Sequence, residues 1–137
     1  MWVLDPANSR ELLDRLRPHS AHPDFDVIWC GEGWRALVSA WHANVVEAFP
    51  DYRWRSIRSA RGVLVLEAKP RAAGATAAEL ARVREVCDRY ARASATVCEW
   101  CGRPGSLRDG RLNRVTLCNT CSGDVATTSY PRARPSA

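Results

Sequence analysis

Apolar residues recur at helical spacing in the first half of the chain. In residues 8–17 they form one face, and Asn8 and Glu11 have the spacing of a capping box, with Pro18 ending the segment. A second helical pattern runs over residues 33–49. The apolar faces of the two helices consist of Leu12, Leu13 and Leu16 in the first, and Trp34, Leu37, Trp41, Val45 and Ala48 in the second.

A third helix is predicted from residue 76 to about residue 94. Thr76 and Glu79 form a second capping box at its start. The loop of residues 69–75 precedes it. One stripe of this helix carries the residues expected to face the core, which are Leu80, Val83, Cys87, Tyr90 and Ser94.

Between the second and third helices the pattern changes to that of strands. Residues 52–58 alternate large and charged side chains, residues 63–68 are apolar, and residues 59–62 can turn the chain, which predicts a hairpin. Residues 27–30 predict a further short strand before a glycine-containing turn. We therefore expect an α+β domain over residues 1–95, with helices packed on a small antiparallel hairpin.

Composition supports one compact domain. The chain has 137 residues, of which 46% are hydrophobic. It contains no run of 18 apolar residues and its start does not resemble a signal peptide, so we expect a cytoplasmic protein with reduced thiols. Under those conditions the six cysteines are metal ligands or buried thiols before they are disulfides.

The cysteines carry the strongest chemical signal. Two C-x2-C pairs, Cys98/Cys101 and Cys118/Cys121, are separated by 16 residues that contain turn signals and, at 111–117, a strand pattern. This spacing is typical of a zinc ribbon, which we place at residues 96–122. Four thiolates saturate a tetrahedral ion, so one structural Zn²⁺ is expected, with no open position for catalysis.

Known catalytic sites that contain such cysteine pairs also need other residues, and this sequence lacks them. A nucleoside deaminase needs a His-x-Glu segment followed by Pro-Cys-x-x-Cys. This chain has no such His-x-Glu segment, and no proline precedes Cys98. A His-Asn-His endonuclease needs a histidine near the knuckles, but His19, His22 and His42 all lie upstream. The second knuckle resembles that of GATA-type fingers, whose basic helix is replaced here by residues 122–124, Ser-Gly-Asp. We predict no catalytic residues.

Weaker candidates have plain structural explanations. His19 and His22 share a loop with two aspartates, which is either a second metal site or a solvated loop. Cys30 is expected to be a buried thiol rather than a nucleophile, and Cys87 a core residue. His42 lies off the apolar face of its helix and is expected to be a surface or partly buried histidine rather than a catalytic one.

The six tryptophans suggest a binding surface. Trp54 lies between Arg53 and Arg55, and tryptophan with arginine is favoured at protein interfaces and also suits single-stranded nucleic acid. A partner-binding strand requires Trp54 to be largely exposed, whereas a structural role would bury it. Trp2 and Trp100 are the next candidates for an anchor.

The formal charge of +5 also bears on the partner. Four zinc-bound thiolates and the ion lower it to about +3, which is mild. We therefore expect a non-catalytic protein that binds a protein partner as an immunity factor, inhibitor or adaptor. The alternative is nucleic-acid binding through the strand and the ribbon arginines, Arg103, Arg108, Arg111 and Arg114.

Residues 123–137 are expected to form a flexible tail. The sequence leaves the oligomeric state open.

The order of these features resembles a family of small bacterial and phage proteins. The matching residues are Gly31, Gly33 and Trp34, then Arg58 with 62–66, then Cys98-Glu99-x-Cys101-Gly102, and finally Thr116-Leu117-Cys118. The resemblance covers about residues 27–122 and implies a helix after the Gly-x-Gly-Trp turn, a hairpin, a further helix and a terminal zinc ribbon. It implies no established activity. Arg58 and Ala60 stand where the resemblance leads us to expect a more lysine-rich strand.

Overall fold

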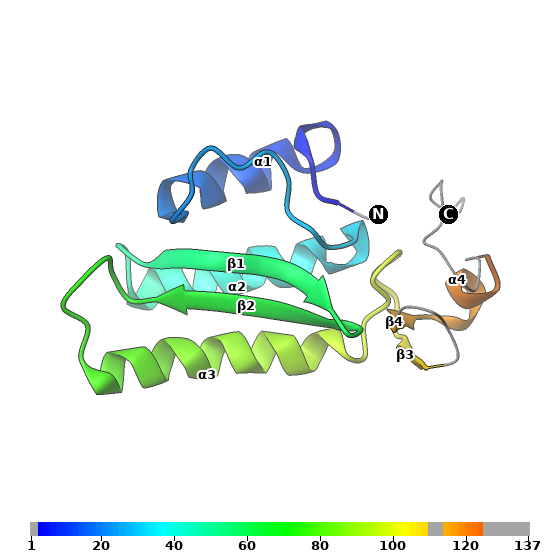
Figure 1. The fold of residues 1–137 in the computed structure, drawn as a ribbon. Coiled ribbons are helices and arrows are strands. Elements are labelled where there is room, and N and C mark those ends of the chain that lie inside the picture. Colours follow the sequence, from blue (N-terminus) through cyan, green and yellow to red (C-terminus); the bar gives the residue numbers. More distant parts are fainter. Residues whose placement is uncertain (1–2, 110–113, 125–137) are drawn as a thin grey trace.

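The computed structural model describes residues 3–109 and 114–124 of the chain. Three helices and a hairpin form a body, and a small C-terminal module follows it (Figure 1). The predicted α+β class, with helices on an antiparallel hairpin and a C-terminal cysteine cluster, is confirmed. The body contains α1 (Pro6–Leu16), α2 (Arg35–Ala48), β1 (Arg53–Ala60), β2 (Val63–Lys69) and α3 (Ala77–Ser94), with short 3₁₀ turns at Arg17–His19 and Glu32–Trp34.

The helix starts show which capping signals decide the boundaries. At α3 the predicted capping box is present, since the Thr76 side chain accepts from the Glu79 backbone and Glu79 accepts from the backbone of Thr76. At α1 the prediction is wrong by one turn, because Asp5 is the cap and Asn8 occupies the third helical position. Asp5 followed by Pro6 is itself a signal for the start of a helix, and it lies before the predicted capping box of Asn8 and Glu11.

The hairpin pairs β1 with β2 in antiparallel register, from Arg53 opposite Lys69 to Ala60 opposite Val63. Arg61 and Gly62 have positive φ at the turn, as a tight hairpin turn requires. The register shifts between Trp54 and Ser56, which is a β-bulge. The bulge inserts one residue, so Trp54 and Ile57 both face the core although they are three positions apart.

The segment before α2 lies along the free edge of β1. Two isolated parallel bridges join them, Ser20 with Trp54 and Trp29 with Arg58. The predicted strand at 27–30 does not form. Only two of its residues pair with other segments, and each makes an isolated bridge: Ile28 with Leu4, and Trp29 with Arg58. These contacts nevertheless cover the edge of β1 that would otherwise be unpaired.

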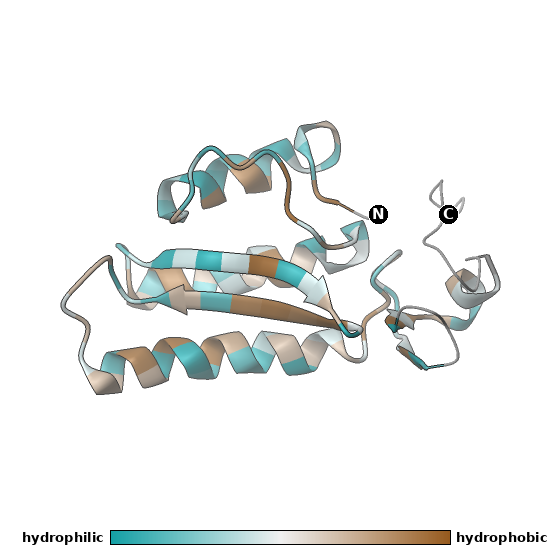
Figure 2. Cartoon of the chain, viewed as in Figure 1, coloured by the Kyte–Doolittle hydropathy of each residue, from teal (hydrophilic) through white to brown (hydrophobic). Residues whose placement is uncertain are grey.

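The core of the body lies between the hairpin and the helices. Trp34, Trp41 and Tyr52 are its largest fully buried residues. Figure 2 shows β2 as largely apolar and β1 as alternating between polar and apolar residues. Leu80 was expected in the core, but its side chain is exposed because it lies in the first turn of α3. Among the described residues, no helix combines the length and the apolar character needed to span a membrane.

The C-terminal module contains β3 (Ser106–Arg108), β4 (Val115–Leu117) and α4 (Asn119–Asp124). The two strands pair antiparallel, and the module has its own small cluster of buried residues built on Trp100, Val115, Leu117 and the cysteines. Of the predicted strand at 111–117, residues 115–117 are β4, and 111–113 lie outside the described residues. Of the predicted tail at 123–137, the first two residues belong to α4 and the others lie outside the described residues.

Candidate metal centre

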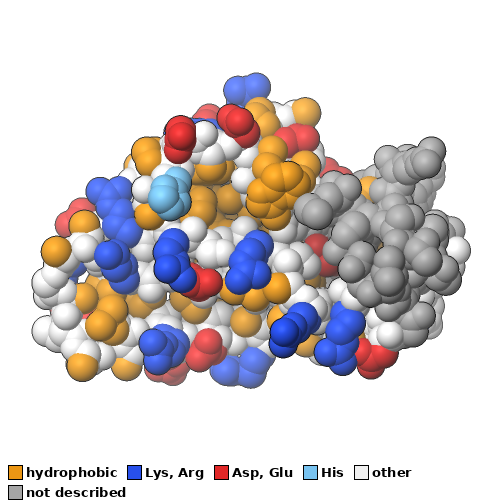
Figure 3. Space-filling model, viewed as in Figure 1, with side chains coloured by type: hydrophobic (Ala, Val, Ile, Leu, Met, Phe, Trp, Pro, Cys, Tyr) orange, Lys and Arg blue, Asp and Glu red, His pale blue; other side chains and the backbone are white. Residues whose placement is uncertain are grey.

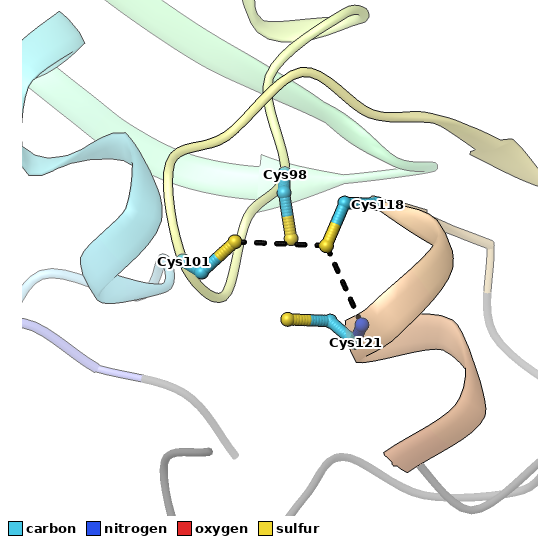
Figure 4. Close-up of side chains that lie close together, drawn as sticks. All are labelled: Cys98, Cys101, Cys118 and Cys121. Carbon is cyan, nitrogen blue, oxygen red and sulfur yellow. Dashed lines mark hydrogen bonds between the residues drawn. The ribbon is translucent and has the colours of Figure 1, made fainter. Parts of the chain in front are cut away.

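Four cysteines converge at the centre of the C-terminal module. Cys98 and Cys101 come from the loop before β3, whereas Cys118 directly precedes α4 and Cys121 lies within it (Figure 4). Their sulfur atoms all lie within 4.8 Å of one another. Within the described part of the chain they are the only group of three or more His, Cys, Asp or Glu side chains able to hold a metal ion.

The spacing of the sulfurs fits a tetrahedral ion. A Zn–S bond of about 2.3 Å places two ligand sulfurs about 3.8 Å apart, and the Cys101 and Cys118 sulfurs lie 3.6 Å apart. Three of the four cysteines are buried and Cys101 is partly exposed. A four-thiolate site of this geometry can hold a metal ion without a bound water.

Tight turns of the backbone bring each cysteine pair together. In the first knuckle the Gly102 amide donates to the Cys98 carbonyl at 2.9 Å, and the Cys98 amide donates to the Arg103 carbonyl at 2.7 Å. Gly102 has φ of +82°, a conformation that favours glycine. In the second knuckle the Cys121 amide points at the Cys118 sulfur at 3.4 Å. Amides that face the sulfurs stabilise thiolate charge.

The thiols differ in acidity within the cluster. Burial raises the pKa of Cys101, but hydrogen bonds from the backbone and side chain of Arg103, with those from Cys98 and Cys118, outweigh burial and lower this pKa to about 7. Burial raises the pKa of Cys98 and of Cys121 above its ordinary value. The protein alone therefore lowers the pKa of the Cys101 thiol and raises that of the Cys98 and Cys121 thiols, and a bound cation would supply the charge that stabilises thiolates.

Glu99, between the two cysteines of the first pair, joins the module to the body. Its side chain is 1% exposed. One carboxylate oxygen accepts from the Gly31 amide and the other from the Ser59 hydroxyl, both at 3.1 Å. Burial raises the pKa of this carboxyl to about 7, against the opposing effect of the Gly31 and Ser59 hydrogen bonds. No local sequence pattern indicates this role of Glu99, because Gly31 and Ser59 are both distant from it along the chain.

Gly33 is the second point of contact between body and module. Its amide donates to the Glu99 carbonyl at 2.8 Å. A Cβ at this position would lie 2.2 Å from the Cys98 carbonyl oxygen, so only glycine permits the approach. The hairpin turn adds a third contact, since the Thr116 hydroxyl donates to the Gly62 carbonyl at 2.6 Å. The module is therefore fixed to both the Gly31–Gly33 turn and the hairpin tip.

Three of the other residues that the sequence singled out as candidates for chemistry are buried in the body. Cys30 is fully buried, and burial with the nearby Glu99 charge raises its thiol pKa, as expected for an inert thiol. Cys87 is buried in the core. His42 is buried rather than near the surface, because its Nδ1 lies 2.6 Å from the Tyr52 hydroxyl, and His19 stacks on the Tyr52 ring. Among the described residues only the four cysteines form a cluster able to hold a metal ion, so the loop with His19 and His22 forms no second site.

The prediction that Trp54 is an exposed anchor is wrong. Its side chain is 5% exposed, and its indole N–H donates to the Leu16 carbonyl at 2.9 Å. The bulge that follows Trp54 turns it toward the core, where it joins the end of α1 to the sheet. Its neighbours differ, since Arg53 is partly exposed and donates to the Pro18 carbonyl, whereas the Arg55 side chain is 74% exposed.

Trp29 is one of the four tryptophans, with Trp2, Trp54 and Trp100, that a small core does not all require, but the sequence did not favour it as the anchor. It is 52% exposed, the most of any large hydrophobic residue described. Trp100 is buried, and Trp2 lies outside the described residues. Trp29 lies in the predicted 27–30 strand, and no local pattern distinguished it from a core residue. Its exposure follows from its bridge to the outer edge of β1.

Comparisons of the chain with protein-family models, curated proteins and solved structures give no match.

Proposed function

We propose that the protein is a non-catalytic zinc-ribbon protein that acts by binding a protein partner, as immunity proteins, inhibitors and adaptors do. The observation that carries the proposal is the exposed side chain of Trp29 beside Arg58 on the outer surface of the body. Tryptophan and arginine are the residues most enriched among those that dominate binding energy at protein interfaces.

The geometry of the cysteine cluster supports a structural role for the metal. We take the ion to be Zn²⁺, because four cysteine thiolates with two C-x2-C spacings are typical of structural zinc. With all four positions filled by sulfur, the ion holds the module together and activates no water. Reduced thiols of this kind are compatible with a cytoplasmic protein.

Nucleic-acid binding is the second candidate, and one observation favours it. Arg55, Arg58 and Arg114 have side chains that are 74%, 48% and 52% exposed. Exposed arginines beside an aromatic residue also suit single-stranded nucleic acid. Trp29 is, however, the one exposed tryptophan among the described residues, so a nucleic acid would find a single stacking platform.

A capture experiment with matched variants tests the proposal. The zinc-loaded full chain, Trp29→Ala and Leu80→Ala are used as bait in lysate of the source cells, and each captured protein is purified and titrated directly. Leu80 is the control because it is also an exposed apolar residue, on α3. We expect Trp29→Ala to weaken direct binding of the purified partner by about 2 kcal/mol or more, as for an anchor residue, and Leu80→Ala to leave it unchanged.

Titration of labelled single- and double-stranded oligonucleotides tests the second candidate. We expect no better than the non-specific range, about 10⁻⁴–10⁻⁶ M at physiological salt. Sub-micromolar binding at that salt concentration, lost when Arg55, Arg58 and Arg114 are neutralised, would establish nucleic-acid binding in place of a protein partner.

A further inference from the structure

One face of the hairpin has no helix of the described chain over it (Figure 1). Opposite residues of an antiparallel pair share a face. The partly or fully exposed pairs, such as Arg58 with Val65 and Arg53 with Lys69, therefore lie on the open face, whereas the buried pair of Ile57 and Leu66 faces the core. We define the hairpin face as Trp29, Arg53, Arg55, Arg58, Val65, Glu67 and Lys69.

Trp29 belongs to this face because of its bridge to β1. It pairs in parallel with Arg58, and its carbonyl accepts from the Ser59 amide at 2.7 Å. Residues level with one another across a bridge point to the same side of a sheet. The indole therefore extends the row formed by Arg58 and Val65, and it is half exposed.

The hairpin face has an excess of positive charge. It has four cationic side chains, those of Arg53, Arg55, Arg58 and Lys69, and one carboxylate, that of Glu67. The face therefore has a surplus of three positive charges. Figure 3 shows basic side chains spread over the surface that the hairpin forms in Figure 1.

Glu67 shows how a carboxylate binds on this face. One of its oxygens lies 2.5 Å from the Arg55 guanidinium and the other lies 3.9 Å from that of Arg58. The two guanidiniums therefore reach one carboxylate from both sides. Each keeps donors free for further acceptors, because a guanidinium has five N–H groups. A second carboxylate supplied from outside would meet the same arrangement.

We propose that the hairpin face binds an acidic segment of the partner protein, with carboxylates against Arg55 and Arg58 and an apolar side chain against Trp29. The inference rests on the proposed function and names the chemistry of its partner. Charge complementarity carries it. A protein segment fits better than a nucleic acid, because Val65 adds apolar surface between the charges, and because Trp29, the one exposed tryptophan among the described residues, offers a single stacking platform.

Selection from a random twelve-residue peptide library tests the proposal. The zinc-loaded full chain is compared with the double variant Arg55→Glu/Arg58→Glu and with the control Arg84→Glu/Arg89→Glu, which makes the same charge change on exposed positions of α3. We expect peptides enriched in Asp and Glu together with apolar residues. Their affinity should fall at least about tenfold in the hairpin-face variant, as reversal of a complementary charge pattern predicts, and stay unchanged in the control.

Glu67→Gln provides a gain of binding that loss of folding cannot imitate. It removes the resident carboxylate, so acidic peptides should bind about threefold tighter or more. Peptides without acidic enrichment, or acidic peptides that bind the hairpin-face variant equally well, would overturn the inference. So would failure of the library to yield binders while a twelve-nucleotide single-stranded RNA binds below micromolar at physiological salt.

The outcomes separate this inference from the function on which it rests. If a captured partner depends on Trp29 but binds the Arg55→Glu/Arg58→Glu variant normally, the protein-binding function stands and the acidic-segment inference is wrong. If neither Trp29 nor the arginines affect any protein partner, both are wrong.

Discussion

The body and the C-terminal module of this protein are held together by different forces. The body buries large aromatic residues, with Trp34, Trp41 and Tyr52 all inaccessible to solvent. The module has a small apolar cluster around Trp100 and Leu117, interrupted by four cysteines. A segment of this size cannot bury enough apolar surface to fold alone, so we expect a metal ion held by the four cysteines to replace the missing core. The comparison predicts that one region depends on packing and the other on metal.

Loss of a metal ligand should produce the largest effect. Cys118→Ser should abolish metal binding and unfold the module, because structural zinc contributes an apparent free energy of about 10–16 kcal/mol in small zinc domains. The body should keep its secondary structure, since its core contains no ligand. Metal content and residue-resolved hydrogen exchange measure both results. Cys30→Ser is the control, because Cys30 lies outside the cluster, and it should retain the ion.

Truncation of an aromatic residue in the core should destabilise the body and leave the metal site of the module intact. Trp41→Ala should destabilise the body by about 3–5 kcal/mol, the range for a buried tryptophan, and leave the metal bound. Trp41 is fully buried in the core cluster of the body. Thermal unfolding followed by circular dichroism, with metal content measured on the same sample, checks this result. Loss of the ion in Trp41→Ala would show that the two regions unfold as one unit.

The contact between the regions should contribute less than either core. Glu99→Ala leaves the Gly31 amide and the Ser59 hydroxyl without their buried acceptor, at a cost of about 1–3 kcal/mol. Faster hydrogen exchange is expected around both partners, with the ion retained. Glu99→Gln is the matched variant, because its carbonyl oxygen can still accept one of the two bonds. Equal protection in wild type and Glu99→Ala would mean that Glu99 does not couple the regions.

The smallest effect concerns the pH dependence of the body. Burial, with the charges of His19 and Arg15, lowers the pKa of His42 below its ordinary value. Below about pH 6.5 the unfolded chain therefore binds this proton more readily, and the body loses stability as pH falls. The metal-free Cys118→Ser variant isolates the body, and adding His42→Gln should flatten its melting temperature between pH 7.5 and pH 5.5. An unchanged pH slope would contradict this role of His42.

The sequence predicted features that local patterns determine. The capping box at Thr76, the hairpin and the two cysteine pairs all depend on residues near one another in the chain. The features it missed depend on contacts between distant segments. A single-residue bulge turns Trp54 inward, and a bridge to β1 leaves Trp29 outside, but neither changes the apolar pattern of its own segment.

The coupling of module to body was also out of reach of the sequence. From the sequence alone, a glutamate between two zinc-binding cysteines is expected to be exposed to solvent, since glutamate is rarely fully buried. Its burial results from the close approach of Gly33, which only the folded chain reveals. The Gly-x-Gly-Trp turn is therefore explained by its contact with the cysteine module, in addition to its place before α2.

Metal content of the wild-type protein tests the central claim most directly. The chain is purified under reducing conditions without chelator, and zinc is measured per chain by elemental analysis and by native mass spectrometry. Four converging thiolates predict about one zinc ion per chain. Well under half an equivalent of zinc, in protein that is folded and reduced, would contradict the account.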